Sequence, residues 1–183
     1  MGWSFTPDYL IGAIWLLWVL SWLVAAFWSD RASLRAPGQW RYRLITWVGI
    51  LVLARPFAHR HHMVWQSPVV IGIAFAWWAR IHLGRLWSAN VTRKADHPII
   101  DTGPYGMVRH PIYTGLLLAL IGTALARGRN SDFAGVALII YGTYLKARLE
   151  ESFLRTQLGA DAYNQYAARV PMLVPFTNGR SVG

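Results

Sequence analysis

Polar and aromatic side chains are concentrated in one short stretch, GPYGMVRHPIYTG, of a chain that is otherwise largely apolar. The stretch covers residues 103–115, and its notable members are Tyr105, Arg109, His110 and Tyr113. Pro111 is suited to the first position of a helix, where backbone N–H groups lack intrahelical partners and favour a carboxylate or phosphate. Because polar side chains are costly at the mouth of an apolar helix, the stretch predicts a binding or catalytic site.

Two adjacent carboxylates, Glu150 and Glu151, follow about one helical hairpin later in the chain. Their charge suits ribose hydroxyls, an ammonium or a sulfonium, whereas Arg109 and His110 suit an anion. A zwitterionic and partly aromatic ligand such as S-adenosylmethionine meets both requirements. The residues alone leave an alternative open, because a basic loop beside acidic lipid headgroups, with a solvated glutamate pair, would have the same composition.

Several other chemistries lack their motifs in this sequence. There is no Gly-rich phosphate loop, no His-Glu-x-x-His helix and no nucleophile elbow. The absence of cysteine excludes disulfides and thiolate chemistry. The run HRHH at residues 59–62 has no carboxylate or cysteine partner at a fixed helical spacing, so we interpret it as a solvated loop and expect no metal site.

The composition predicts an all-α, polytopic integral membrane protein. Of the 183 residues, 55% are hydrophobic and only 14% charged, which is too apolar for an ordinary soluble domain. A helix needs about 20 apolar residues to cross a bilayer. About five transmembrane helices are expected, at residues 9–28, 40–57, 68–87, 111–126 and 133–145. Small residues in the last two favour close helix packing and a helical hairpin.

The basic residues indicate the topology. With the N-terminus outside, most Lys and Arg fall in the cytoplasmic stretches, while the other side receives Arg55, Arg60, Arg127 and Arg129. This asymmetry follows the positive-inside rule, so the net charge of +10 reflects topology and nucleic acid is not an expected partner. We expect a cytoplasmic (inner) membrane protein with a cytoplasmic C-terminus. The first span, which has no basic flank before it, is expected to be retained, not cleaved as a signal peptide.

The chain is interpreted as a single domain, residues 1–183. Residues 1–87 would form the N-terminal spans, and residues 88–176 the cytoplasmic cofactor-binding half. Turn signals predict an ordered inner loop over residues 88–110. The tail, residues 146–183, is expected to form a cytoplasmic helix followed by an extended segment that could cover this loop.

Three segments together resemble one family: HPII at residues 97–100, GPYGMVRHPIYTG, and EESFLRTQLGADAYNQYAARVPMLVPF at residues 150–176. Over residues 90–176 the chain resembles the isoprenylcysteine carboxyl methyltransferase and phospholipid methyltransferase superfamily, which is integral to membranes. The resemblance implies S-adenosylmethionine contacts from His97, Ile99, Ile100, Tyr105, His110, Pro111, Tyr113 and Glu150, with Glu151 as a neighbour.

The resemblance also implies a basic residue shortly before the acidic pair that holds the substrate carboxylate. Two residues are candidates for substrate binding. Arg148 is favoured because a guanidinium binds a carboxylate in bidentate fashion, but Lys146 lies one helical turn before Glu150. Arg148 and Glu150 are the predicted catalytic residues.

The expected function is therefore S-adenosylmethionine-dependent methyl transfer to a lipophilic acceptor at the cytoplasmic membrane face, foremost carboxyl O-methylation of an isoprenylcysteine-like substrate. Such a transfer chiefly needs placement and desolvation and requires no metal. Alternatives are methylation of a phospholipid amine or a small hydrophobic thiol, an NADPH-dependent membrane reductase, and a non-enzymatic membrane scaffold. The partners would be a prenylated or lipid substrate and membrane lipids, and the sequence does not indicate an oligomeric state.

Two further sets of side chains each have two possible interpretations. Arg80 and His82 either face the site or extend to the membrane interface. Tyr163, Tyr166 and Arg169 belong either to a lid over the cofactor or to an amphipathic tail lying on the membrane.

Overall fold

Helices make up nearly all of the structure, a computed structural model that describes residues 7–27, 34–54, 66–87, 92–93 and 99–177. The α-helices are α1 (Pro7–Ala26), α2 (Trp40–Leu53), α3 (Gln66–Leu83), α4 (Pro104–Met107), α5 (Pro111–Arg127), α6 (Asn130–Leu158) and α7 (Ala160–Arg169). A 3₁₀ turn, η2 (Gly84–Leu86), extends α3. The predicted helical class is confirmed.

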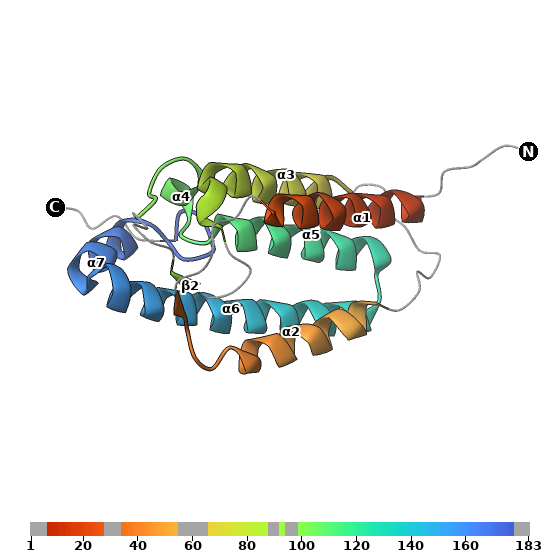
Figure 1. Ribbon diagram of the computed structural model, residues 1–183. Helices are drawn as coiled ribbons and strands as arrows, with labels where there is room; N and C mark the ends of the chain where they lie inside the picture. The colour runs from red at the N-terminus through yellow and green to blue at the C-terminus, as the bar shows by residue number, and fades with distance from the viewer. Residues whose placement is uncertain (1–6, 28–33, 55–65, 88–91, 94–98, 178–183) are drawn as a thin grey trace, which may run out of the picture.

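The long helices lie side by side in two layers. Figure 1 shows α1, α3 and α5 in one layer and α2 with α6 in the other, while α4 and α7 lie together at one end. α3 packs along α5, and α2 packs along α6. We call the end with α4 and α7 the site end, and the opposite end, where α5 turns into α6, the hairpin end.

The site end collects the segments that the sequence analysis placed on one side of the membrane. A two-residue strand before α2, β1 (Leu34–Arg35), pairs in antiparallel register with β2 (Thr92–Arg93). The connection before α2 and the connection after α3 therefore meet at the same end of the bundle. Gly128, whose φ of 64° suits glycine, makes the tight turn at the hairpin end.

The C-terminal half of α6 differs from the expectation. A fifth span at 133–145 and a separate tail helix were predicted, but α6 is one continuous helix of 29 residues. No proline or glycine interrupts it after Gly142, and i,i+4 pairs between Lys146 and Glu150 and between Glu151 and Arg155 favour its continuation.

Small residues let the helices approach closely, although not between the helices expected. Gly115 of α5 meets the backbone of Gly72 in α3, so a side chain at either position would collide with the other helix. Gly135 of α6 likewise faces the backbone of Gly49 in α2. The small residues of α5 and α6 therefore pack against α3 and α2, whereas we expected them to pack within the hairpin.

None of the helices in the described ranges is both long enough and apolar enough to qualify as a membrane span.

Candidate functional site

His110 occupies a constrained position just before α5. The residue preceding a proline is restricted away from the helical region, and His110, before Pro111, has φ −124° and ψ 62°, outside that region. Its backbone N–H donates to the carbonyl of Met172 at 3.1 Å, and that of Arg109 donates to Pro171 at 2.8 Å. The chain after α7 thus fixes the entry to α5.

The two ring nitrogens of His110 face two different carboxylates. Nδ1 lies 3.5 Å from Glu150 Oε2, and Nε2 lies 3.3 Å from Glu151 Oε1. The ring stacks on that of Tyr113, with centroids 5.4 Å apart and planes inclined by 6°. A doubly protonated imidazole can therefore donate to both glutamates while its face stays covered.

Each glutamate has further partners. Arg109 Nε lies 2.8 Å from Glu151 Oε1, and Arg155 Nη2 lies 3.4 Å from its Oε2. The Tyr113 hydroxyl donates to Glu150 Oε1 at 2.7 Å, and Lys146 Nζ lies 4.0 Å from the same oxygen. We call this set, Arg109, His110, Tyr113, Lys146, Glu150, Glu151 and Arg155, the carboxylate cluster.

The two carboxylates differ in their exposure to solvent. The side chain of Glu151 is 2% exposed, whereas that of Glu150 is 19% exposed. Glu151 is held by two guanidinium groups as well as by His110. Glu151 therefore anchors the cluster, and Glu150 is the carboxylate that a ligand can reach.

The cluster shifts the protonation equilibria of its members. Burial by itself would lower the pKa of His110, but hydrogen bonds to Glu150 and Glu151 raise it above its ordinary value. Burial would raise the pKa of both glutamates, yet the hydrogen bonds from His110 lower it, to about 2 for Glu151, where Arg109 also contributes. The geometry thus favours an imidazolium between two carboxylates at neutral pH.

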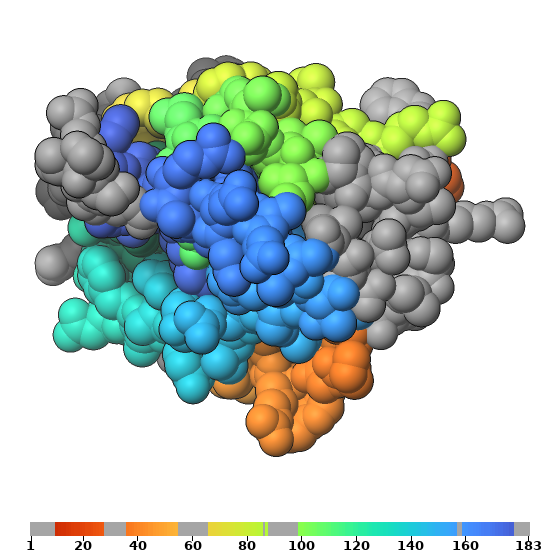
Figure 2. Space-filling view, turned by 90° about the vertical axis from the view of Figure 1, so that its left-hand side faces the viewer, coloured from red at the N-terminus to blue at the C-terminus, as the bar shows by residue number. Residues whose placement is uncertain are grey.

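The end of α7 and the segment that follows it close over the start of α5. We call residues 167–173 the strap. Arg109 Nη1 donates to the carbonyls of Ala167 (2.8 Å) and Val170 (2.6 Å), and Thr114 Oγ1 donates to that of Leu173 at 2.7 Å. Figure 2 looks onto the site end, where α7 and the strap (blue) lie against the segment from α4 to α5 (green).

An apolar wall lies beside the cluster. Tyr105 and Ile112 form a buried group with Ala79, against which Ile100 packs. Burial raises the pKa of Tyr105, and its backbone carbonyl accepts a hydrogen bond from Tyr166 at 2.8 Å. Ile99 packs against a second buried group, which α7 contributes. The loop before α4 is therefore held between α3 and α7.

The structure brings together most of the residues singled out from the sequence. His110, Tyr113, Glu150 and Glu151 are in contact, and Pro111 is buried in the first turn of α5. Ile99, Ile100 and Tyr105 lie in the adjoining apolar groups. His97 lies outside the described residues, as does the HRHH run.

The two candidate substrate cations lie on different faces of α6. Lys146 is four residues before Glu150 and shares its face, with Nζ 5.1 Å from the centroid of the Tyr113 ring. Arg148 is exposed and, being two residues from Glu150, points to nearly the opposite side of the helix. The structure thus brings Lys146 into the carboxylate cluster and does not bring Arg148 there.

Several other side chains have roles that the sequence left open or missed. Arg80 is buried and donates to the carbonyls of Gly84 (2.6 Å) and Ala25 (2.6 Å), so it joins the ends of α3 and α1. His82 lies 3.0 Å from Thr102 Oγ1 and steadies the loop before α4. Arg109 was not among the predicted cofactor contacts, although its position next to His110 was the available signal.

Comparisons with known proteins identify relatives of this chain. A curated relative, the cobalt-zinc-cadmium resistance protein CzcN of Cupriavidus metallidurans, is 27% identical over 141 residues, which are 74% of this chain and 64% of that protein. Protein-S-isoprenylcysteine O-methyltransferase B of Arabidopsis thaliana is 28% identical over 113 residues, 60% of this chain and 57% of the relative. The chain thus covers less than two thirds of either relative.

A solved structure shares the fold. The eukaryotic intramembrane Ras methyltransferase ICMT aligns with 98% of this chain and 55% of its own, with a TM-score of 0.51 and 20% identity. The family model for the isoprenylcysteine carboxyl methyltransferase (ICMT) family matches residues 63–155, about half of the chain. The chain belongs to this family, whose matched region runs from α3 to the carboxylate cluster.

Proposed function

We propose that this protein transfers the methyl group of S-adenosylmethionine to a lipophilic acceptor, and that the reaction is carboxyl O-methylation of an isoprenylcysteine-like molecule. The observation that carries the proposal is the arrangement of His110 between Glu150 and Glu151 at the start of α5, in the region that matches the ICMT family. When bound, the cofactor would supply an activated methyl group on a sulfonium.

The donor set fits such a cofactor. Glu150 is a partly exposed carboxylate that can attract a cation or accept from hydroxyl groups, and the start of α5 can receive a carboxylate. Ile99, Ile100 and Tyr105 offer the apolar surface that an adenine ring needs. We propose these residues, with His97, His110, Pro111, Tyr113 and Glu151, as the cofactor-binding set.

The protein's own groups would orient the reactants and exclude water. Arg109 and the strap keep His110 in place, and His110 holds Glu150 in its charged form. A carboxylate acceptor needs no base, because it has no proton to lose. Lys146 would attract that carboxylate from the cluster side, and Arg148 remains the proposed partner on the exposed face of α6.

We also propose that the chain is an integral membrane protein whose long helices cross a cytoplasmic membrane about five times, with the site end on the cytoplasmic side. Residues 1–87 would form the N-terminal spans. Large apolar side chains point outward from the bundle and support this assignment. Among them are Leu16, Leu17, Leu20, Leu23, Trp47, Leu51, Ile71 and Ile81. The basic residues of the connections at the site end agree with this orientation.

The test is calorimetric titration of the detergent-purified full chain with S-adenosylmethionine and S-adenosylhomocysteine, with NADPH as comparator. Saturable binding of the first two ligands is expected, followed by methyl transfer to N-acetyl-S-farnesyl-L-cysteine in preference to phosphatidylethanolamine or a hydrophobic thiol. Folded protein that binds neither donor ligand would overturn the proposal, and binding of NADPH instead would favour a reductase.

A further inference from the structure

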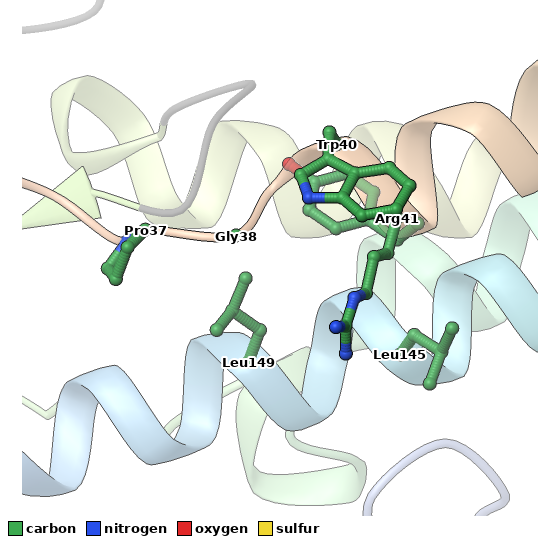
Figure 3. A pocket seen from close by; sticks show the side chains of 7 residues that line it. Pro37, Gly38, Trp40, Arg41, Leu145 and Leu149 are labelled. Atoms are coloured by element: carbon green, nitrogen blue, oxygen red, sulfur yellow. The ribbon is translucent and has the colours of Figure 1, made fainter.

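A cavity of about 310 Å³ lies between the start of α2 and α6, beside the carboxylate cluster. Its walls combine aromatic and aliphatic side chains with one charge, from Trp40, Arg41, Tyr42, Leu145 and Leu149. We call this cavity the α2 groove. Figure 3 shows Arg41 reaching from α2 toward α6, while Leu149 points toward Gly38. The lining part of α2 precedes residue 63, so it lies outside the region that matches the family.

The charge of the α2 groove is one-sided. Among the described residues that line it, Arg41 is the only charged one. Of the four charged residues directly next to the lining in sequence, Arg43, Lys146 and Arg148 are also basic, and Glu150 is acidic. The Glu150 carboxylate is already engaged with His110, Tyr113 and Lys146. A cationic site with apolar walls is complementary to an amphipathic anion.

One layer of side chains separates the groove from the cluster. The Tyr42 ring lines the groove, and Lys146 Nζ lies 5.7 Å from its centroid. The same Nζ lies 5.1 Å from the centroid of Tyr113 and 4.0 Å from Glu150 Oε1. Lys146 is thus held between two aromatic rings, with the groove on one side and the reachable carboxylate on the other.

We infer that the α2 groove binds the methyl acceptor as an amphipathic carboxylate, with its anionic group drawn to Arg41 and its apolar chain on Trp40, Leu145 and Leu149. This inference rests on the proposed function, because it takes the occupant of the groove to be the molecule that is methylated. The position of the groove, one layer of side chains away from Lys146 and Glu150, favours the acceptor over a lipid that only surrounds the protein. Arg41 would then determine the selection of an acid over an amine.

The experiment measures equilibrium binding of N-acetyl-S-farnesyl-L-cysteine and of its methyl ester, without methyl donor. We expect Arg41→Gln to weaken binding of the acid about tenfold, as the loss of one charge-assisted hydrogen bond does, and to leave binding of the ester within twofold. Arg41→Lys, which keeps the charge, should stay within about threefold. Arg43→Gln is the matched control, since Arg43 donates to Gln39 and does not line the groove.

Equal weakening of acid and ester, or equal effects of Arg41→Gln and Arg43→Gln, would overturn the inference. Displacement of the acid by vesicles of phosphatidylglycerol as effective as displacement by unlabelled acid would overturn the assignment to an acceptor. Binding of S-adenosylmethionine is titrated separately. If that ligand does not bind while the acid binds through Arg41, the proposed function fails and the groove stands as an anion-binding site; the reverse result rejects the groove alone.

Discussion

The α5–α6 hairpin carries a buried ionic cluster at each end, and the two differ in composition. At the hairpin end, Asp132 is fully buried between Arg127 (Nε to Oδ2, 3.1 Å) and Arg129 (Nη2 to Oδ1, 3.0 Å). Arg127 also donates to the carbonyl of Leu53 at 2.8 Å, which joins the end of α2 to the hairpin. At the site end, two carboxylates share an imidazole, a phenol, an ammonium and two guanidinium groups.

This contrast distinguishes a structural ion-pair cluster from a ligand-binding site. A guanidinium stays charged at every physiological pH, so both cations that face Asp132 keep their charge throughout that range. An imidazole can gain or lose a proton where a guanidinium cannot, and Lys146 and Tyr113 each contact Glu150 through a single group. The cluster at the site end can therefore exchange partners when a ligand arrives, whereas that at the hairpin end holds three helices together.

The largest expected effect concerns the hairpin end. Asp132→Asn removes the partner of a buried guanidinium, so we expect the free energy of unfolding to fall by about 3–5 kcal/mol. Affinity of the remaining folded protein for S-adenosylmethionine should not change. Thermal unfolding in detergent measures the first quantity and calorimetry the second. Asp161→Asn, on an exposed part of α7, is the charge-matched control. An unchanged melting temperature in Asp132→Asn would contradict the structural role of the Asp132 cluster.

The opposite pattern is expected at Glu150. Glu150→Gln keeps the shape of the side chain but removes its charge, so affinity for S-adenosylmethionine should fall about 10- to 100-fold, the range of one or more charged hydrogen bonds. The melting temperature should fall less than in Asp132→Asn, because Glu150 is partly exposed. A variant that loses stability yet keeps full affinity would reverse the assignment of the two clusters.

The cluster at the site end should make the stability of the protein depend on pH. The pKa of His110 is raised, so its pairing with the glutamates stabilises the protein fully below about pH 6.5 and is lost as pH rises through the raised value. The pKa of Glu151 is lowered to about 2, so its contribution is present above about pH 4.5 and is lost as pH falls toward 2.

Melting temperature between pH 4 and pH 9 measures this response. We expect the wild type to be most stable in mildly acidic solution and to lose stability on the alkaline side. His110→Asn should flatten the alkaline part of the profile. An alkaline loss that persists in His110→Asn would assign the titration to another group.

The smallest effect is expected for Tyr113→Phe. The substitution removes the 2.7 Å hydrogen bond to Glu150 and keeps the ring that stacks on His110. Loss of one such bond corresponds to about 0.5–1.5 kcal/mol, so affinity for S-adenosylmethionine should fall about two- to tenfold. Tyr141→Phe, at an exposed position of α6, serves as control. A loss of more than about 100-fold would mean that the hydroxyl contacts the reacting groups.

Local pattern was enough to predict several elements. Pro111 predicted the start of α5, and Pro68 and the apolar run after it predicted most of α3. The stretch at residues 103–115 and the pair at 150–151 were identified as the two halves of one site. These features depend on neighbours in the chain, where proline geometry and apolar runs act directly.

The faces of α6 could not be assigned in this way. Favouring Arg148 rested on guanidinium chemistry, although the i,i+4 spacing already placed Lys146 beside Glu150. What the spacing could not show is which face of α6 meets His110 and Tyr113, because that depends on how α6 packs on α5. The strap was expected only as a tail that could cover the loop. Its carbonyls bind Arg109 and Thr114, some 60 residues away, through contacts that no local pattern encodes.

By itself, the sequence determined the helical class, the order of the helices and the presence of paired basic and acidic motifs. Only the tertiary structure decided which nitrogen of His110 meets which glutamate, which small residues meet which helix, and that a groove from the first half of the chain opens beside the cluster. The physical reason is the distance along the chain over which each interaction acts. Helix formation depends on neighbours within a turn or two, whereas an ion pair or a cavity requires atoms from distant segments to come within a few ångströms.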